Sequence, residues 1–352
     1  MRRLFALLTC LVACTSHAAD TPPLSRDIKD WNVTCDNVRT CTAVSTRPAS
    51  AEAGELYFPL RITRQAGPQG ALRVGVFSYI ELHGDPLIDG QPVRMPLVQR
   101  KRSDYDVSAV PELRSATGAS ALTFIKALRN AHELAFSTSD DPTTASLDGM
   151  TGALLLIDDI QGRVGTVTAL ARPGAAPASD VPAAPAAPVA PAWTAPAPLD
   201  KGVAEQVLKA AMDASRQQWQ RDVVDDDEPK GEVHALNAEQ ALLIVQTGCS
   251  AYNCAYRLYV TPLADPAQVK GAPFEEGVVL PDVEPDGSVA FDPATGELTS
   301  LTLAMGMGGC GTTARWRYDG ARFVLIHAAQ MNACMGLSDH DWPVLWETKA
   351  QR

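Results

Sequence analysis

A run of proline and alanine in the middle of the chain limits the folds that this sequence can adopt. Residues 173–198 read PGAAPASDVPAAPAAPVAPAWTAPAP. Proline lacks a backbone N–H and clashes with the preceding helical turn, so this run can form neither a helix nor a central strand. We expect an extended, semi-rigid linker between two folded domains. The predicted boundaries are residues 20–172 for the first domain, 173–199 for the linker and 200–352 for the second domain.

The N-terminus has the pattern of a secretory signal peptide. Arg2 and Arg3 precede an apolar run over residues 4–13, and small residues follow it. The run is too short to span a bilayer, which requires about 20 apolar residues, and no later segment is apolar enough to do so. We therefore expect residues 1–18 to be a signal peptide that directs the chain to the periplasm. The stretch LVAC, which ends at Cys14, also matches a bacterial lipobox, so lipidation of Cys14 stays open as a second form of processing.

The chain is acidic, with a formal net charge of −11 over 352 residues. Removal of the two N-terminal arginines would make the mature protein more negative still. An acidic surface repels phosphate backbones and anionic lipid headgroups, so we expect no nucleic-acid partner and no charge-driven membrane binding. The apolar fraction of 46% is sufficient for well-packed cores.

Six cysteines follow the predicted signal peptide, and an even number in an exported chain indicates disulfides. They are Cys35, Cys41, Cys249, Cys254, Cys310 and Cys334. If each domain closes its own bonds, Cys35 pairs with Cys41, whereas the other four allow three pairings. Among these we favour Cys249–Cys254 with Cys310–Cys334. The spacings CDNVRTC and CSAYNC lack the C-x-x-C of a zinc knuckle, so we expect no metal site, and we expect no cofactor.

Helical periodicity is confined to three segments. Apolar spacing predicts a helix over residues 120–130, capped by Ser120, and another over 147–160. A third helix is expected over 203–219, with Asp200 before it as a possible cap.

The remaining periodic segments alternate as β-strands do, and two Asp-Gly pairs signal two-residue hairpins, at 89–90 and at 319–320. We therefore expect an α+β fold with an N-terminal α+β sheet domain and a C-terminal, mainly antiparallel β domain with one leading helix. The segments that predict strands are 31–35, 40–45, 56–62, 72–80, 241–246, 256–261, 289–292, 298–303, 315–318 and 322–327.

The stretch GMGGCGTTARWRYDG at 306–320 contains the G-x-G-x-x-G pattern of a dinucleotide-binding turn. Such a turn needs a helix after the glycines, because the pyrophosphate binds at the helix N-terminus. Here the residues after Gly311 predict a strand and a hairpin instead. We interpret the stretch as a glycine-rich corner closed by Cys310, not as a nucleotide site.

Four separated motifs resemble those of one bacterial family. They are DWNVTCDNVRTCTA at 30–43, DDIQGRVGTVTALARPG at 158–174, GGCGTTARWRYDGARFVL at 308–325 and MNACMGLSDHDWPVLWET at 331–348. In this order they resemble the family called domain of unknown function 1176, over nearly the whole chain after the signal peptide. The resemblance implies an exported proteobacterial protein without an assigned activity. The family's glycine corner carries charged residues, which AMGMGGCG at 304–311 lacks, so a ligand bound by those charges is not expected here.

Candidate site residues are few. Neither G-x-S-x-G nor S-x-x-K occurs. His340, between Asp339 and Asp341, is the histidine in the most reactive setting, although we favour a solvated turn there. Four aromatic residues could form a surface patch that binds sugar or peptide, although we favour a place in the core for them. The aromatic residues concerned are Trp316, Tyr318, Trp342 and Trp346.

These observations favour a non-catalytic binding or structural module of the cell envelope, with an envelope ligand or protein as its partner. One alternative is an envelope hydrolase, which would show a cleft around His340 and Asp341. Another is a small protein inhibitor that presents the disulfide-braced loop 249–254.

Overall fold

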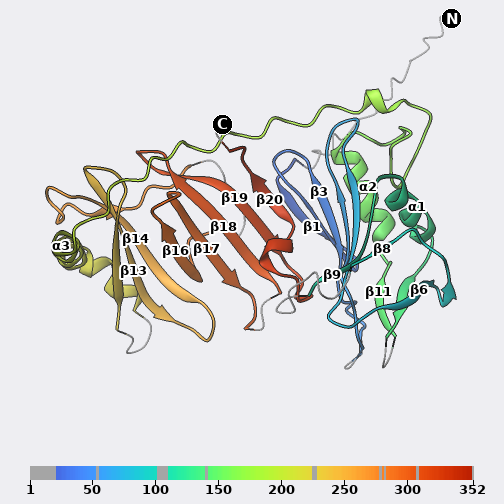
Figure 1. Ribbon diagram of the computed structural model, residues 1–352, viewed down its shortest axis with the longest axis horizontal. Helices are drawn as coiled ribbons and strands as arrows, with labels where there is room; N and C mark the ends of the chain where they lie inside the picture. Colours follow the sequence, from blue (N-terminus) through green and yellow to red (C-terminus); the bar gives the residue numbers. More distant parts are fainter. Residues whose placement is uncertain are drawn as a thin grey trace, which may run out of the picture.

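Antiparallel β-sheet is the main regular structure of this chain, as a computed structural model shows (Figure 1). It describes residues 21–52, 55–100, 110–138, 142–223, 228–276, 280, 283–306 and 309–350. Within these ranges the strands form four sheets, accompanied by three α-helices. The predicted signal peptide and the lipidation candidate Cys14 lie outside the described residues.

The N-terminal half, residues 21–172, contains a seven-stranded and a four-stranded sheet. The strands are β1 (Leu24–Ile28), β2 (Trp31–Cys35), β3 (Cys41–Ser45), β4 (Leu60–Arg64), β5 (Leu72–Phe77), β6 (His83–Ile88), β7 (Gln91–Pro92), β8 (Val98–Gln99), β9 (Glu112–Thr117), β10 (Glu133–Ser137) and β11 (Thr143–Ser146). Their orders are β1-β2-β3-β4-β5-β9-β8 and β11-β10-β6-β7.

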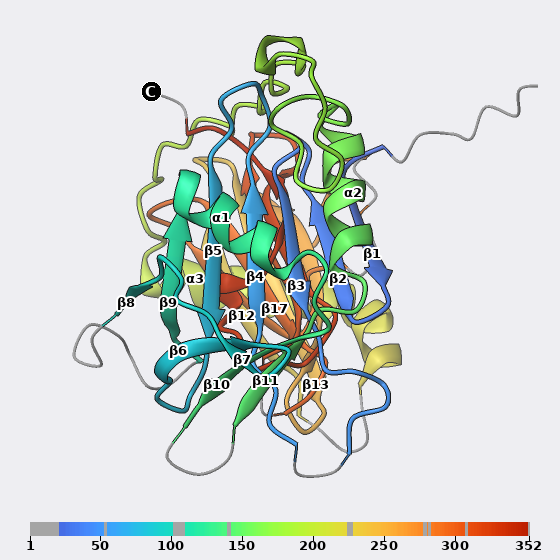
Figure 2. The same ribbon diagram turned by 90° about the vertical axis from the view of Figure 1, so that its right-hand side faces the viewer.

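Two helices, α1 (Gly118–Leu128) and α2 (Met150–Ile160), cover one face of the larger sheet (Figure 2). In α1 the buried side chains include Phe124, Ile125 and Leu128, which share one face of the helix. They join Trp31 and Leu154 in a single buried cluster between sheet and helices. The N-terminal half therefore has a core of its own.

The C-terminal half, residues 200–350, begins with α3 (Lys201–Trp219), continues through a short turn, η3 (Gln220–Asp222), and then forms two sheets. The first is β12 (Lys230–Ala235), β13 (Gln240–Cys249), β14 (Cys254–Pro262) and β15 (Lys270–Gly271), in that order. The second is β16 (Ser288–Asp292), β17 (Glu297–Leu303), β18 (Gly311–Tyr318), β19 (Phe323–Met331) and β20 (Val344–Glu347).

Both sheets of the C-terminal half contribute to one apolar core. Leu242 and Ile244 of the first sheet are buried with Leu298, Trp316 and Phe323 of the second. On the other face of the first sheet, α3 packs on β12 and β13 through a smaller cluster around Ala211, Trp219 and Leu243. The first sheet is thus covered on both faces, whereas one face of the second is left for other contacts.

Several local predictions can be compared with these elements. Asp89 and Gly90 both have positive φ and join β6 to β7, so the predicted two-residue hairpin is confirmed. The prediction for 319–320 is wrong, because Tyr318 pairs with Phe323 and the connection therefore has four residues. The Asp319 carboxylate accepts two backbone N–H groups inside that longer turn.

All three predicted helices are present, although their bounds differ by a few residues from the predicted ones. The expectation that Ser120 caps α1 is wrong, because the helix begins two residues earlier and Thr117 occupies the capping position. Asp200 does occupy the capping position of α3, although its side chain makes no capping bond.

Apart from one short 3-10 turn, η2 (Ala178–Asp180), the Pro/Ala-rich segment 173–199 is extended and lies along both halves of the molecule (Figure 1). On the N-terminal half, Pro182 lies against Gly162. On the C-terminal half, the Ala190 N–H donates to the Lys349 carbonyl at 2.9 Å. The Trp193 indole packs edge-on against Phe291 and donates to the Pro293 carbonyl at 3.0 Å. The segment is therefore largely extended and contacts the surface of both halves.

The two halves meet through a shared apolar cluster, which we call the joint. Val44 and Phe77 of the N-terminal half are buried there against Met331, Leu337 and Trp342 of the C-terminal half. Polar contacts surround the joint. The Asn37 amide donates to the Glu347 carbonyl at 3.0 Å, and the Glu347 N–H donates back to the Asn37 side chain at 2.9 Å.

The six cysteines form the disulfides Cys35–Cys41, Cys249–Cys254 and Cys310–Cys334, which are the pairs favoured from the sequence. Gly311 opens β18, so a strand and not a helix follows the glycine corner. A Cβ at Gly311 would lie 2.0 Å from the Thr302 carbonyl oxygen, so this position needs glycine for close packing. The interpretation of the stretch as a disulfide-closed corner agrees with this geometry.

Asp36 is a buried acid at the edge of the joint. Its carboxylate accepts backbone N–H groups from Thr40 at 2.7 Å and Val38 at 2.9 Å. Burial raises the pKa of Asp36 from 3.8 to about 7, against the effect of these hydrogen bonds, and the nearby Glu347 carboxylate adds to the rise. Near neutral pH the folded protein therefore holds a proton that the unfolded chain does not.

We predict that Asp36 makes the protein less stable as the pH rises. The folded state keeps the proton up to about pH 7 while the unfolded state loses it near 3.8, so stability falls across that window and is level above it. Asp36→Asn keeps an acceptor oxygen for the two N–H groups and removes the titration. At about pH 8 the variant should be more stable in urea unfolding, by roughly 1 kcal/mol or more. A parallel pH dependence in both proteins would contradict the assignment.

Candidate functional site

One face of the β16–β20 sheet is hollowed into a cleft of about 480 Å³, which we call the sheet cleft. Its lining comes from all five strands and from the turn η4 (Asp339–Asp341) before β20. The lining residues are Ser288, Ala290, Thr299, Ser300, Leu301, Thr313, Arg315, His327, Ala329, Asp339, His340, Trp342 and Val344.

The floor of the sheet cleft is built by strand register. Two rows of directly opposed residues cross the sheet and project from the same face, because side chains alternate along each strand. The first row is Ala290, Thr299, Arg315, His327 and Glu347. The second row is Ser288, Leu301, Thr313, Ala329 and Val344. Polar residues thus gather in the first row and small or apolar ones in the second.

His327 is the most perturbed group of the cleft. Burial lowers its pKa from 6.5 to about 4, the Arg315 cation beside it lowers it further, and Glu297 acts in the opposite direction. Arg315 in turn pairs with Glu297 at 3.3 Å. The imidazole is therefore neutral at neutral pH, with one nitrogen able to accept and the other to donate. Within the described chain its ring makes no hydrogen bond.

The hydroxyl protons of the floor threonines already form hydrogen bonds within the protein. Thr299 Oγ1 donates to the Ala290 carbonyl at 3.2 Å, and Thr313 Oγ1 donates to the Ser300 carbonyl at 3.1 Å. A hydroxyl has one proton and two lone pairs, so both groups can offer a ligand only acceptor capacity. The floor therefore favours ligands that donate hydrogen bonds.

The wall at η4 is held in place from the N-terminal half. Arg61 Nη1 donates to the Asp341 carbonyl at 2.8 Å and to its carboxylate at 3.0 Å, and the Arg61 guanidinium stacks on Phe77. Trp342 is buried in the joint and donates its indole N–H to the Leu337 carbonyl at 3.0 Å. The cleft thus has one wall whose position depends on contacts with the other half.

The structure brings together only part of what the sequence singled out. His340 and Asp339 do line a cleft, whereas Asp341 is engaged by Arg61 and does not line it. Sequence reasoning missed His327. Strict alternation along 323–331 would place His327 on the same face as Phe323 and Leu325. The register shift in the pairing of β18 with β19, where Arg315 faces His327 and Trp316 faces Leu325, places it on the opposite face, and no local signal in the sequence indicates this bulge.

The four aromatic residues considered for a patch belong mainly to the core. Trp316, Tyr318 and Trp342 are buried, and Trp346 is partly buried against the same cluster as Trp316. Of the four, Trp342 also contributes to the cleft wall.

A second group of perturbed charges is structural. Arg163 is fully buried, and burial lowers its pKa to about 10. Its guanidinium donates to Gln161 and to the carbonyls of Gln65 and Gly67, and so ties the turn after α2 to the β4–β5 hairpin. Asp158 accepts two backbone N–H groups from the same turn. This network gives Asp158, Gln161 and Arg163 of the 158–174 motif a structural role.

Two further observations concern metal ligands and membrane-spanning helices. Among the residues that the structure describes, no three His, Cys, Asp or Glu side chains are grouped so that they could hold a metal ion. In the same residues, no helix combines the length and the apolar character needed to cross a membrane.

The structure is that of a mainly antiparallel β-sheet protein with a cleft on one of its sheets. Comparison with known proteins gives the family. Residues 25–349 match the family described as "Protein of unknown function (DUF1176)", so the chain belongs to that family. It is 30% identical over 343 residues to "Uncharacterized protein YpfG" of Escherichia coli (strain K12), covering 93% of this chain and 94% of that protein. No solved structure matches.

We predict that His327 makes the protein less stable in acid. The unfolded chain takes up a proton near pH 6.5 and the folded protein only near 4, so stability falls as the pH drops through that window. The titration can be followed directly by NMR of the His327 ring. Arg315→Gln should raise the pKa of His327, because it removes the neighbouring cation, while Glu297 stays in place through its ion pair with Arg317 at 2.6 Å. An unchanged or lowered pKa in this variant would contradict the proposed cause.

Proposed function

We propose that this protein is an exported, non-catalytic binding module of the cell envelope that holds a hydroxyl-rich, sugar-like ligand in the sheet cleft. The observation that carries the proposal is the hydrogen-bonding capacity of the floor. Thr299 and Thr313 offer acceptors only, and His327 offers a neutral ring without an internal partner. We further propose that residues 20–172 and 200–352 act as two domains, with 173–199 as the connection between them.

The chemistry of a saccharide fits this cleft. Each sugar hydroxyl can donate to a threonine or imidazole acceptor. Arg315 can donate to the lone pairs of the sugar oxygens, and the Asp339 carboxylate can accept a further hydroxyl proton. Trp342 and Val344 supply an apolar wall for the C–H groups of the ring. A volume of about 480 Å³ is within the usual range for small-molecule sites.

The same geometry argues against covalent catalysis. A nucleophile must lie within hydrogen-bond reach of its base. Here both threonine hydroxyls donate to backbone carbonyls, and no described residue lining the cleft forms a hydroxyl–imidazole pair. A base with a pKa of about 4 is also far below the neutral value that favours proton transfer at pH 7. An envelope hydrolase is therefore the less favoured function.

One observation supports the inhibitor alternative. The loop closed by Cys249–Cys254 is braced by Asn253, whose side chain bonds both the N–H and the carbonyl of Leu303 at 2.9 and 2.8 Å. Tyr252 stands at its tip and is 44% exposed. A rigid loop with an exposed aromatic residue is a suitable protein contact, so this loop is the place to test if no small ligand binds.

The ligand prediction can be tested by titration calorimetry with disaccharides of glucose, galactose and N-acetylglucosamine. We expect at least one to bind, and its O-methylated form, which lacks the donors, to bind at least tenfold more weakly. Thr313→Val should weaken binding about three- to tenfold, because it removes one acceptor.

The matched control is Thr302→Val. Thr302 lies on β17 and donates to a backbone carbonyl, that of Asp286, but does not line the cleft. The Thr302→Val variant should leave disaccharide binding unchanged. Equal affinity for the hydroxylated and O-methylated sugars would argue against the acceptor-rich floor as the basis of recognition, and hydrolysis of a bound disaccharide would favour the enzyme alternative.

Export is supported by the N-terminal pattern, and the three disulfides are compatible with a location outside the cytoplasm. Expressed at full length in a Gram-negative host, the protein should be released by osmotic shock with residues 1–18 removed, as intact mass would show. Lipidation would instead leave Cys14 as the first residue, with a diacylglycerol mass and membrane retention that Cys14→Ala abolishes. Cytoplasmic protein that keeps residues 1–18 would refute export.

A further inference from the structure

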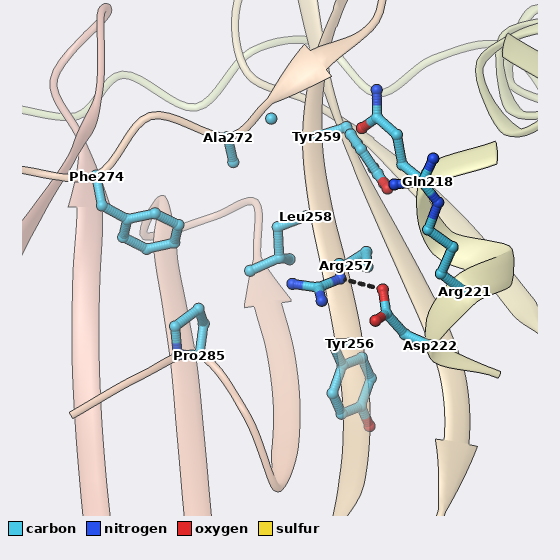
Figure 3. Close-up of a pocket in the computed structure, with 11 residues that line it drawn as sticks. Gln218, Arg221, Asp222, Tyr256, Arg257, Leu258, Tyr259, Ala272, Phe274 and Pro285 are labelled. Carbon is cyan, nitrogen blue, oxygen red and sulfur yellow. Dashed lines mark hydrogen bonds and ion pairs between the residues drawn. The ribbon is translucent and has the colours of Figure 1, made fainter. Parts of the chain in front are cut away.

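A second pocket, of about 540 Å³, lies across the edge of β14 and shares no lining residue with the sheet cleft (Figure 3). We call it the edge pocket. It is formed by the end of α3, by η3, by β14 and β15, and by the segments around Phe274 and Pro285. Its lining residues are Gln218, Arg221, Asp222, Tyr256, Arg257, Leu258, Tyr259, Gly271, Ala272, Phe274 and Pro285.

The edge pocket exists because β14 is paired along only part of its outer edge. β15 pairs with β14 at Tyr259 and Val260, and Cys254 forms an isolated bridge with Gly287. The Leu258 carbonyl also accepts the Ala272 N–H at 2.8 Å, so in the described chain only residues 255–257 have no partner strand on this side. A free strand edge of this kind leaves room for a ligand beside the backbone.

The two faces of β14 make the edge pocket polar on one side and apolar on the other. Tyr259 belongs to the cluster beneath α3, whereas Leu258, next along the strand, packs against the core between the two sheets. Phe274 joins Leu258 on the apolar side, where it also contacts Trp316 and Phe323. A ligand that fills the pocket therefore needs a polar end and an apolar body.

Arg257 is oriented as an anion-binding fork. Its Nε donates to the Asp222 carboxylate at 2.6 Å, and this bond raises the pKa of Arg257. Figure 3 shows the two Nη groups turned away from Asp222 into the pocket, towards Leu258. Within the described residues these Nη groups make no hydrogen bond. A guanidinium held through Nε presents its other N–H groups in the geometry that binds a carboxylate with two parallel hydrogen bonds.

Tyr259 provides an independent sign of a missing polar partner. The residue is 2% exposed, and its hydroxyl has no hydrogen-bond partner in the part of the chain that the structure describes. A buried, unpaired hydroxyl is costly, so a ligand that accepted its proton would gain a hydrogen bond that the described chain leaves unmade. In Figure 3 the hydroxyl points towards Gln218 and Arg221. Both are exposed side chains that can turn aside without disturbing the core.

We propose that the edge pocket binds a carboxylate attached to an apolar body. The carboxylate would lie on the free Nη groups of Arg257 and accept the Tyr259 hydroxyl, with Arg221 as a further cation. The apolar body would lie against Leu258, Phe274 and Pro285. Free aromatic acids and the C-terminal ends of peptides share this chemistry, and the unpaired edge of β14 would add main-chain hydrogen bonds only for a peptide.

The test measures binding of phenylpropionate and of its uncharged amide to the full-length protein by NMR titration. The acid should bind saturably, at least tenfold more tightly than the amide, and shift the Tyr259 and Arg257 signals. A tripeptide ending in phenylalanine is the second arm. Tighter binding of the tripeptide than of phenylpropionate assigns the peptide source, and equal or weaker binding assigns the free acid.

Three variants separate recognition from folding. Arg257→Gln should weaken acid binding about tenfold or more, and Tyr259→Phe about three- to tenfold without lowering the melting temperature, because an unpaired hydroxyl is removed. Arg216→Gln is the control, since Arg216 lies on α3 and pairs with Asp213 outside the pocket.

Three outcomes would overturn the proposal. The first is equal binding of phenylpropionate and its amide, and the second is full affinity for phenylpropionate in Arg257→Gln. The third is that neither phenylpropionate nor the tripeptide binds saturably, up to its solubility limit, to protein that circular dichroism shows to be folded. None of these outcomes bears on the sheet cleft, because the two sites share no residue.

Discussion

The apolar joint between Val44 and Phe77 on one side and Met331 and Trp342 on the other fixes the elements around the sheet cleft. The face of the β16–β20 sheet that carries the cleft is partly covered by this cluster, and only the uncovered part is hollow. Because Trp342 is buried in the joint and also lines the cleft, the packing of the two halves and the shape of the site are set by the same side chain. Arg61 reinforces this coupling, since it bonds η4 from the opposite half.

Hydrogen-bonding capacity, more than charge, distinguishes the two pockets. In the sheet cleft the backbone carbonyls of neighbouring strands take the threonine protons, and burial together with Arg315 keeps His327 neutral. In the edge pocket the free groups are donors, the Arg257 fork and the Tyr259 hydroxyl. A ligand suited to one pocket therefore carries the wrong groups for the other, and competition between their ligands is not expected.

Local sequence signals predict elements well here and sites poorly. The helices, the first Asp-Gly hairpin and two of the cysteine pairs follow from short-range patterns, because helical periodicity, turns and the disulfides Cys35–Cys41 and Cys249–Cys254 involve residues close together in the chain. His340 stood out because its neighbours Asp339 and Asp341 are adjacent in sequence. His327 did not, because its lowered pKa comes first from burial and then from Arg315, and both depend on strand register and packing rather than on neighbours in the sequence. The edge pocket is harder still to predict, since it depends on where β15 stops pairing.

The docked course of the Pro/Ala-rich segment bears on how the protein would bind. A flexible tether would let the halves open and close around a ligand, and ordering them would reduce the affinity. Here Ala190 and Trp193 bond the C-terminal half while Pro182 contacts the N-terminal half, so the segment restrains the halves at a second place besides the joint. Proline also limits the conformations that the segment gains on release. Two restraints on one pair of halves favour a preformed cleft, in which ligand entry requires side-chain adjustment rather than closure of one half on the other.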